Sequence, residues 1–235
     1  MKNIVFILAG GTGSRVGGET PKQLLPLGDG RTVLEHAVDA FEQSHYIDEI
    51  VVVMHPDRLK EAEELVHKNT WRKVKQVISG GKERWESSWN GISMYLKEDK
   101  KDPDVFYWFH DAARPFVSQE IISRVAEGLK THLAVTVGVP VTDTLYKVKG
   151  ERVKVKGKWK VESIPNRMEF MRAQTPQAFH YLVIGPAYMR AIEKGKIKAT
   201  DDVGILMEYN PEVEVYIVEG EEANRKITYA SDLAN

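Results

Sequence analysis

Short apolar runs alternate with longer amphipathic segments along this chain. Six of the runs are rich in β-branched or aromatic residues, which predicts buried strands at residues 4–8, 50–54, 74–78, 105–109, 134–139 and 213–218. Four longer segments repeat apolar residues at helical spacing, which predicts helices at residues 33–44, 58–68, 83–96 and 119–131. Strands that alternate with helices in this way are typical of a doubly wound α/β fold with a mostly parallel sheet.

Two of the predicted helices follow polar residues that can cap their first turn. Thr32 precedes the first helix, and Glu35 stands at the spacing of a capping box. Ser118 precedes the last of the four helices. These side chains support the positions at which both helices are expected to begin.

Residues 146–164 break the alternation of strands and helices. β-Branched or aromatic residues alternate there with charged residues around Gly150 and Gly157, which predicts a β-hairpin at about residues 146–165. This hairpin is either a solvated excursion or an arm that contacts a second subunit, because a basic hairpin without its own core needs support. The length of 235 residues otherwise favours a single domain over residues 1–235.

The composition argues against several classes of partner and of chemistry. Lys and Arg number 33 against 34 Asp and Glu, a net charge of −1, so we expect no general attraction to nucleic acid or to an anionic membrane. No apolar stretch approaches the ~18 residues of a membrane span, and the first apolar run lacks the features of a signal peptide. The absence of Cys excludes disulfides, thiolate metal sites and Cys nucleophiles. We therefore expect a soluble, cytoplasmic protein.

A glycine-rich loop follows the first predicted strand, with Gly10, Gly11, Gly13, Gly17 and Gly18. Glycines at this position let backbone N–H groups approach a phosphate, although a simple turn would also favour them. The loop differs from two familiar nucleotide-binding loops. Val16 stands where a dinucleotide fingerprint needs its third Gly, and the Gly-Lys pair of a Walker A loop does not occur here.

Two cations, Arg15 and Lys22, lie on either side of the Thr20-Pro21 turn in this loop. Attack on a nucleotide α-phosphate builds negative charge on its oxygens and on the departing pyrophosphate. Fixed cations beside a backbone cradle stabilise that charge, so Arg15 and Lys22 are candidate catalytic residues. The alternative is that both are solvated surface cations.

Seven motifs occur in order between Leu8 and Thr228. They begin with L-A-G-G-x-G-x-R-x-G…P-K-Q at residues 8–23, G-G-x-x-R-x-x-S at 80–87 and H-D-A-x-R-P at 110–115. The other four lie at residues 140–144, 174–177, 200–202 and 224–228. Together they resemble the family of methylerythritol-phosphate and ribitol-phosphate cytidylyltransferases. The resemblance covers nearly the whole chain and implies a Rossmann-like, GT-A-like nucleotidyltransferase fold.

The resemblance also implies a nucleotide site and a metal site. The residues expected to bind CTP are Ala9, Gly10, Gly11, Thr12, Gly13, Gly80, Gly81, Arg84, Ser87 and Ala112. Asp111 follows the fourth predicted strand, at the sheet edge where doubly wound folds bind ligands. A carboxylate there suits the Mg²⁺ that bridges triphosphate oxygens, whereas the alternative for Asp111 is an ion pair with Arg114.

The acceptor site is expected to bind a sugar-alcohol phosphate, which brings a dianion and several hydroxyl groups. By the resemblance, Arg167 and Lys226 are catalytic residues that position the attacking phosphate. The acceptor-binding set is Asp111, Arg114, Thr144, Arg167, Thr200 and Lys226. The resemblance further implies a homodimer in which the hairpin arm completes the partner's pocket. The sequence departs from the family pattern at Arg225, Trp85 and Val16, and Arg225 leaves open which of two adjacent cations contacts the acceptor.

The function implied by the resemblance is transfer of CMP from CTP to a sugar-alcohol phosphate with release of pyrophosphate. Residues 111–113 and 200–202 favour 2-C-methyl-D-erythritol 4-phosphate as the acceptor, whereas residues 8–11 and 164–167 favour D-ribitol 5-phosphate. Outside the family, the alternatives are an NAD(P)-dependent oxidoreductase with a degenerate fingerprint and a nucleotide-binding protein without catalytic activity. Of the two acceptors, we favour 2-C-methyl-D-erythritol 4-phosphate.

Overall fold

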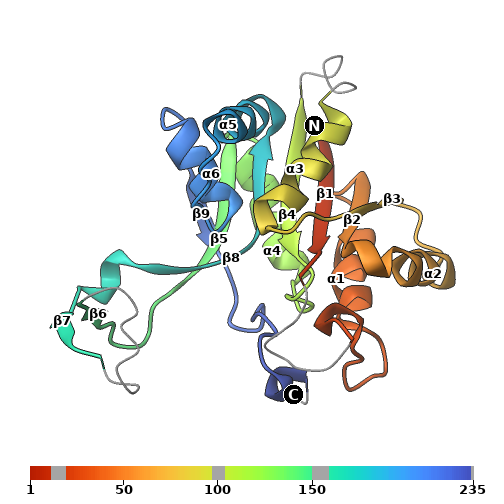
Figure 1. The fold of residues 1–235 in the computed structure, drawn as a ribbon, viewed down its shortest axis with the longest axis horizontal. Coiled ribbons are helices and arrows are strands. Elements are labelled where there is room, and N and C mark those ends of the chain that lie inside the picture. The colour runs from red at the N-terminus through yellow and green to blue at the C-terminus, as the bar shows by residue number, and fades with distance from the viewer. Residues whose placement is uncertain (12–19, 97–103, 150–158, 234–235) are drawn as a thin grey trace.

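One seven-stranded sheet forms the centre of the protein (Figure 1). The computed structural model describes residues 1–11, 20–96, 104–149 and 159–233. The strand order is β3-β2-β1-β4-β8-β5-β9, and only β8 runs antiparallel to its neighbours. The strands are β1 (Lys2–Ala9), β2 (Glu49–Met54), β3 (Val74–Ser79), β4 (Val105–Asp111), β5 (Ala134–Pro140), β8 (Met171–His180) and β9 (Tyr216–Glu219).

Helices cover both faces of this sheet, so the central strands are buried on both sides. The helices are α1 (Val33–Glu42), α2 (Leu59–Asn69), α3 (Arg84–Tyr95), α4 (Gln119–Leu129), α5 (Tyr181–Lys194) and α6 (Asp202–Tyr209). Val5 and Ile7 of β1 belong to the core cluster that includes residues of α1, α2 and α4. Ile4 and Phe6 point to the opposite face and pack in the cluster that includes residues of α3, α5 and α6. The period of two along β1 therefore fills two separate cores.

Most of the predicted elements are confirmed, with small shifts at their ends. Thr32 and Glu35 form the expected capping box at α1, and the Ser118 side chain accepts from the Ile121 amide at the start of α4. The last predicted strand is shorter than expected, because β9 begins at Tyr216. The chain also contains β8, α5 and α6, which the hydrophobic pattern did not reveal.

The predicted hairpin is present as an arm that extends away from the sheet (Figure 1). Strands β6 (Lys147–Val148) and β7 (Val161–Ser163) pair in antiparallel fashion, and residues 150–158 between them lie outside the described residues. The 3₁₀ helix η4 (Arg167–Glu169) follows β7. The arm exposes several large apolar side chains, namely Tyr146, Trp159, Val161, Ile164, Met168 and Phe170.

The arm is inserted between two neighbouring strands. β5 ends at Pro140 and β8 begins at Met171, and these two residues are paired across the strands. Both ends of the arm therefore leave the sheet at the same place. This place is the edge at which the parallel strands end.

The carboxyl edge of the sheet also brings distant parts of the chain together. β1 and β4 end side by side, with Leu8 opposite Asp111. The segment of residues 220–228 crosses this edge, since the Ile227 amide donates to the Ala113 carbonyl oxygen at 2.8 Å. No helix in the described part of the chain combines the length and apolar character needed to cross a membrane.

Candidate active site

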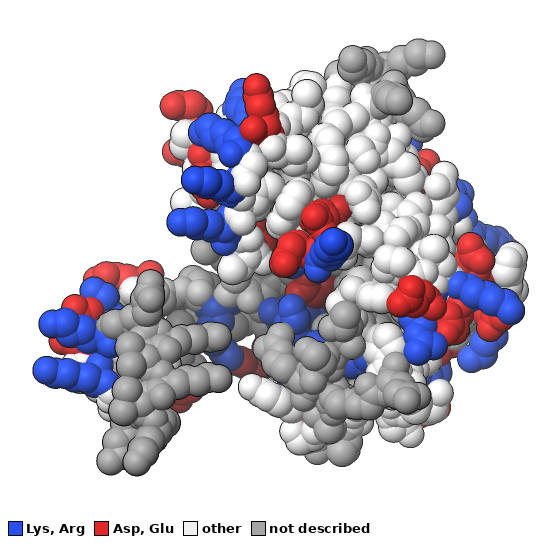
Figure 2. Space-filling model, viewed as in Figure 1, with Lys and Arg blue, Asp and Glu red and all other residues white. Residues whose placement is uncertain are grey.

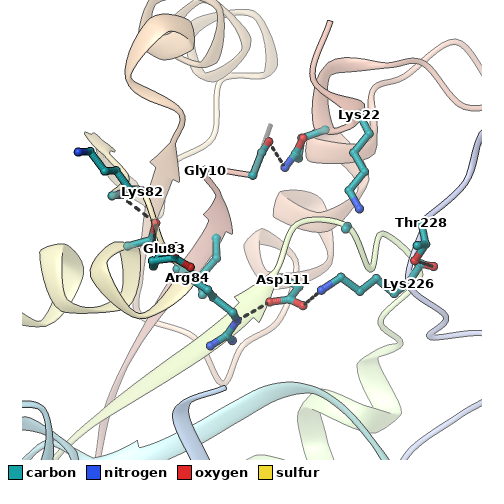
Figure 3. A pocket seen from close by; sticks show the side chains of 14 residues that line it. Gly10, Lys22, Lys82, Glu83, Arg84, Asp111, Lys226 and Thr228 are labelled. Carbon is teal, nitrogen blue, oxygen red and sulfur yellow. Dashed lines mark hydrogen bonds and ion pairs between the residues drawn. The ribbon is translucent and has the colours of Figure 1, made fainter. Parts of the chain in front are cut away.

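A pocket of about 270 Å³ opens at the carboxyl edge of the sheet (Figure 3). Eight residues that line it were expected from the sequence: Gly10, Gly11, Lys22, Gly81, Arg84, Ser87, Asp111 and Lys226. Six others that line it were not: Leu8, Gln23, Lys82, Glu83, Ala113 and Thr228. The structure therefore brings together residues from four of the motifs that the sequence separates by up to about two hundred positions.

Asp111, the last residue of β4, lies between two cations (Figure 3). Arg84 Nε donates to Asp111 Oδ1 at 3.1 Å, and Lys226 Nζ donates to Asp111 Oδ2 at 2.6 Å. These contacts join the start of α3, the end of β4 and the segment before the C-terminus. The alternative of an ion pair with Arg114 is not what the structure shows, because the Arg114 guanidinium donates to the carbonyl oxygens of Asn224 and Ala173.

The opposite charges in this cluster offset the cost of burying each of them. Burial alone would raise the pKa of Asp111, but Arg84 and Lys226 outweigh it and hold that pKa far below its usual range. Burial likewise disfavours the charge of Arg84, whereas Asp202 and Asp111 raise its pKa. Asp111 is therefore an anion near neutral pH, and it offers a carboxylate to the pocket.

His110 precedes Asp111 and is fully buried. Burial lowers its pKa to about 4, so the imidazole is neutral near pH 7. Its Nε2 lies 2.9 Å from the Arg114 carbonyl oxygen and its Nδ1 lies 3.0 Å from Thr175 Oγ1. Because the carbonyl can only accept, Nε2 carries the proton and the Thr175 hydroxyl donates to Nδ1. Thr175 Oγ1 in turn accepts from the Asp111 amide at 3.1 Å, so this network fixes the end of β4.

Lys22 also lines the pocket, and its side chain points toward Asp111 and Lys226 (Figure 3). Its side chain is buried, and Nζ donates to the Ile227 carbonyl oxygen at 2.6 Å. An ammonium group has three N–H donors, so this contact is compatible with a further contact to a phosphate. The other expected members of the glycine loop, Thr12, Gly13 and Arg15, lie outside the described residues.

Close packing explains two of the glycines. A Cβ atom on Gly80 would lie 2.9 Å from Ser87 Oγ and 3.3 Å from the Met54 carbonyl oxygen, and one on Gly10 would lie 3.1 Å from Ser87 Oγ. Ser87 is itself buried, and its hydroxyl accepts from the Gly81 amide at 3.1 Å. Ser87 therefore joins the two glycine segments at the floor of the pocket.

Several expected site residues lie close to the pocket without lining it. Ala9 is a buried residue of β1, and the buried Ala112 donates its amide to the Leu8 carbonyl oxygen at 3.0 Å. Ala113 lines the pocket in place of Ala112. Trp85, whose bulk departs from the family pattern, packs against the core near α3 and α5 and is absent from the pocket wall.

The expected acceptor residues do not all line the pocket. Lys226 lines the pocket, whereas the adjacent Arg225 places its guanidinium 5.3 Å from the centre of the Phe116 ring. Arg167 is on η4 at the base of the arm and donates to the Thr142 carbonyl oxygen. Thr144 and Thr200 are exposed and do not line the pocket. Of the two neighbouring cations, Lys226 is thus the one that faces the site.

Asp202 contacts Arg84 directly, and sequence reasoning gave it no role. It belongs to the motif at residues 200–202, which was a signal that this position matters. Thr228, at the end of the last motif, also lines the pocket without having been assigned.

The described residues contain no group of three or more His, Cys, Asp or Glu that would hold a metal by itself. Protein sites for Mg²⁺ often supply only one or two carboxylates, with the remaining ligands coming from substrate phosphates and water. Asp111 faces the pocket with an ionised carboxylate, so it fits a metal ion that arrives with a triphosphate. Glu83 is the other carboxylate that lines the pocket.

Sequence comparisons agree with this geometry. Residues 3–235 match the family model described as IspD, 2-C-methyl-D-erythritol 4-phosphate cytidylyltransferase. A 2-C-methyl-D-erythritol 4-phosphate cytidylyltransferase from Thermobifida fusca (strain YX) is 42% identical over 228 residues, covering 97% of this chain and 89% of the relative. The bifunctional ribulose 5-phosphate reductase/CDP-ribitol pyrophosphorylase Bcs1 from Haemophilus influenzae is 37% identical over 99% of this chain and 47% of its own length.

Solved structures are similar over the same length. The 4-diphosphocytidyl-2C-methyl-D-erythritolsynthase from Anaerococcus prevotii DSM 20548 has a TM-score of 0.80 at 26% identity, covering 99% of this chain and 93% of that one. The α/β nucleotidyltransferase fold expected from the motifs is therefore confirmed. Since the family model and the Thermobifida relative both span nearly the whole chain, the chain belongs to the 2-C-methyl-D-erythritol 4-phosphate cytidylyltransferase family.

Proposed function

We propose that this enzyme transfers CMP from CTP to the phosphate of 2-C-methyl-D-erythritol 4-phosphate and releases pyrophosphate. The observation that carries the proposal is the meeting of Lys22, Asp111 and Lys226 at one pocket beside the Gly10-Gly11 backbone. This arrangement offers amides and cations for a triphosphate and a carboxylate for its metal ion. The cytoplasmic location expected from the composition is part of this proposal.

The reaction needs positioning and charge stabilisation more than proton transfer. A phosphate monoester is already largely dianionic near neutral pH, so no general base is required. One of its oxygens attacks the α-phosphorus of CTP, and the bond from that phosphorus to the oxygen of the β-phosphate breaks. Lys22, Arg15 and Lys226 would offset the negative charge that grows on the α-phosphate and on the leaving pyrophosphate.

Asp111 would hold Mg²⁺ with the triphosphate, and the bound ion would neutralise part of the phosphate charge. Lys226 now donates to Asp111 Oδ2 at 2.6 Å. Lys226 would contact the acceptor phosphate beside the carboxylate that would hold the metal ion. The same two residues would then serve both substrates.

The second candidate acceptor is D-ribitol 5-phosphate, which is favoured by the 37% identity to the Haemophilus relative named for CDP-ribitol. Initial rates of pyrophosphate release, measured with CTP and each acceptor in turn, test both. We expect the methylerythritol phosphate to have the higher kcat/KM. A wide advantage for ribitol phosphate would reverse the assignment, and a thermal shift with NAD(P) but none with CTP and Mg²⁺ would instead favour the oxidoreductase.

We further propose a homodimer in which the arm of one subunit completes the acceptor site of the other. Arg167 and Thr144 are on or next to the arm and do not line the pocket of their own subunit. The exposed apolar side chains of the arm would be covered by a second subunit, and large exposed apolar patches commonly mark such contacts. A C₂ dimer would place each arm against the partner in the same way.

Mixing two inactive variants tests this exchange of residues. Arg167→Ala removes a cation of the arm, and Lys226→Met removes one of the cations that line the pocket. In a mixed dimer, the pocket of the first variant would meet the intact arm of the second, while the other site would carry both defects. Random reassociation makes about half of the dimers mixed, so about one quarter of all sites should be restored. If Arg167 serves its own subunit, every site in the mixture keeps one defect and activity does not recover. The Arg167→Ala, Lys226→Met double variant mixed with itself is the control.

A further inference from the structure

A buried carboxylate lies directly behind the pocket. Asp202 is the first residue of α6 and has no exposed surface. Its Oδ2 accepts from Arg84 Nη1 at 2.7 Å, and its Oδ1 accepts from the Tyr188 hydroxyl at 2.6 Å. The Asp202 amide donates to Gln177 Oε1 at 3.0 Å, which fixes the backbone at this position. Asp202 is thus held from three sides.

Arg84 connects this buried carboxylate to the one in the pocket. Its Nη1 binds Asp202, and its Nε binds Asp111 Oδ1 at 3.1 Å. Its third nitrogen, Nη2, is buried and has no hydrogen-bond partner among the described residues. A guanidinium group can grip one carboxylate with two parallel N–H donors, and Nε with Nη2 is one pair that can do so.

In the structure, Arg84 contacts Asp202 and makes only a single-donor contact with Asp111. While Nη1 is directed at Asp202, only Nε reaches Asp111, and Oδ2 of Asp111 remains with Lys226 on the pocket side. If the charge of Asp202 were removed, the guanidinium would be able to turn so that Nε and Nη2 contact both oxygens of Asp111. Lys226 would then lose its partner, and the pocket would lose an available carboxylate oxygen.

We propose that Asp202, oriented by Tyr188, is a positioning residue that holds Arg84 in a single-donor contact and so keeps one oxygen of Asp111 directed into the pocket. This inference rests on the proposed function, because it assigns the oriented oxygen to the triphosphate and its metal ion. Asp202 touches no substrate in this scheme. It acts only through Arg84.

Asp202→Asn keeps the size of the side chain and removes its charge. We expect kcat/KM to fall about 10- to 100-fold, the usual effect of losing a group that orients a metal ligand. Tyr188→Phe, which removes only the hydroxyl that binds Asp202, should have a smaller effect in the same direction. Glu35→Gln is the matched control, because Glu35 is also a buried carboxylate with a cationic partner, Lys68, at 3.0 Å. A similar loss of activity in this control would overturn the proposal.

A double-mutant cycle separates positioning from a general structural role. In an Arg84→Met background, Asp202→Asn should change kcat/KM by less than about twofold, because the residue through which it acts is already gone. The thermal midpoints of the variants are measured alongside. If the effects of the two substitutions on kcat/KM simply multiply, Asp202 does not act through Arg84.

Structures of the Asp202→Asn variant test the idea independently of any reaction. We expect the guanidinium of Arg84 to contact both oxygens of Asp111 and Lys226 Nζ to move away from Asp111. Unchanged geometry would overturn the inference even if the enzyme makes the expected product. Conversely, a wild type that forms no product with either acceptor would refute the proposed function, while the crystal structures would still decide the role of Asp202.

Discussion

Replacing Asp111 with Asn should lower turnover by at least about 10³-fold, since several kcal/mol of transition-state stabilisation are lost with a metal ligand and each ~1.4 kcal/mol is a factor of ten. The substitution removes the carboxylate that now accepts from Arg84 and Lys226 (Figure 3). Two cations would then face each other without the anion between them. We expect the variant to fold, because the amide keeps the shape of the side chain, but to unfold at a lower temperature than the wild type.

The pH dependence of stability provides a second measurement on the same variant. The cations hold the pKa of Asp111 in the folded protein below its ordinary value of 3.8. A carboxyl group with a lowered pKa stabilises the folded state above the unfolded pKa, and this contribution is lost as the pH falls further. The difference in unfolding free energy between wild type and Asp111→Asn should therefore be constant near neutral pH and shrink below about pH 3.8.

The control for this substitution is Asp57→Asn, whose side chain is 85% exposed. It should leave turnover unchanged. If Asp111→Asn retains most of the wild-type turnover at saturating Mg²⁺ and CTP, Asp111 is not a metal ligand in this enzyme.

Lys22→Ala is expected to lower kcat by about 10²-fold or more, the cost typical of deleting a donor that stabilises a transition state. Lys22 lines the pocket with a buried side chain, and its ammonium group is fixed by the Ile227 carbonyl oxygen at 2.6 Å. The charge is therefore held in place before the reaction begins. A saturating concentration of a small primary amine should restore part of kcat, because it can replace the missing ammonium group in the space left by the side chain.

Lys60→Ala serves as the comparison, because Lys60 lies on α2 with 86% of its side chain exposed. It should leave kcat unchanged. A large rise in the acceptor KM of Lys22→Ala without a fall in kcat would mean that Lys22 only supports the segment around Ile227. Unchanged turnover would remove Lys22 from the mechanism.

The charges on the molecular surface are consistent with the near-zero net charge read from the sequence. Figure 2 shows Lys and Arg side chains close to Asp and Glu over the visible face of the body. No single sign of charge dominates there. The basic groups proposed to bind phosphate are instead gathered in the pocket, which agrees with the expectation that phosphate chemistry in this protein depends on local residues.

Much of the fold was predictable because the parallel strands are buried on both faces. Residues 4–8 and 50–54 are continuous apolar runs, which is the pattern that such burial produces. The glycine segments and Asp111 were predictable as site residues from the family motifs and because each follows a predicted strand. Because these strands end at the same edge of the sheet, the residues that follow them lie close together.

β8 and the link from Arg84 to Asp202 could not be predicted, because both depend on buried polar residues. β8 contains Gln174, Thr175 and Gln177, all of which are buried and hydrogen-bonded to other segments. A strand whose inner positions are polar has no apolar period to detect. The link from Arg84 to Asp202 joins residues 118 positions apart, and nothing in the local sequence shows which of the two carboxylates in residues 201–202 faces Arg84.

The reversed direction of β8 has a consequence for how enzymes of this shape can diversify. A connection between parallel neighbours must travel the whole height of the sheet, but Pro140 and Met171 are partners, so the chain between them departs and returns at one spot. Its length can change with little effect on the rest of the molecule, since doubling a loop costs only about 0.6 kcal/mol in closure entropy. The arm can therefore be lengthened, shortened or replaced while the sheet stays as it is.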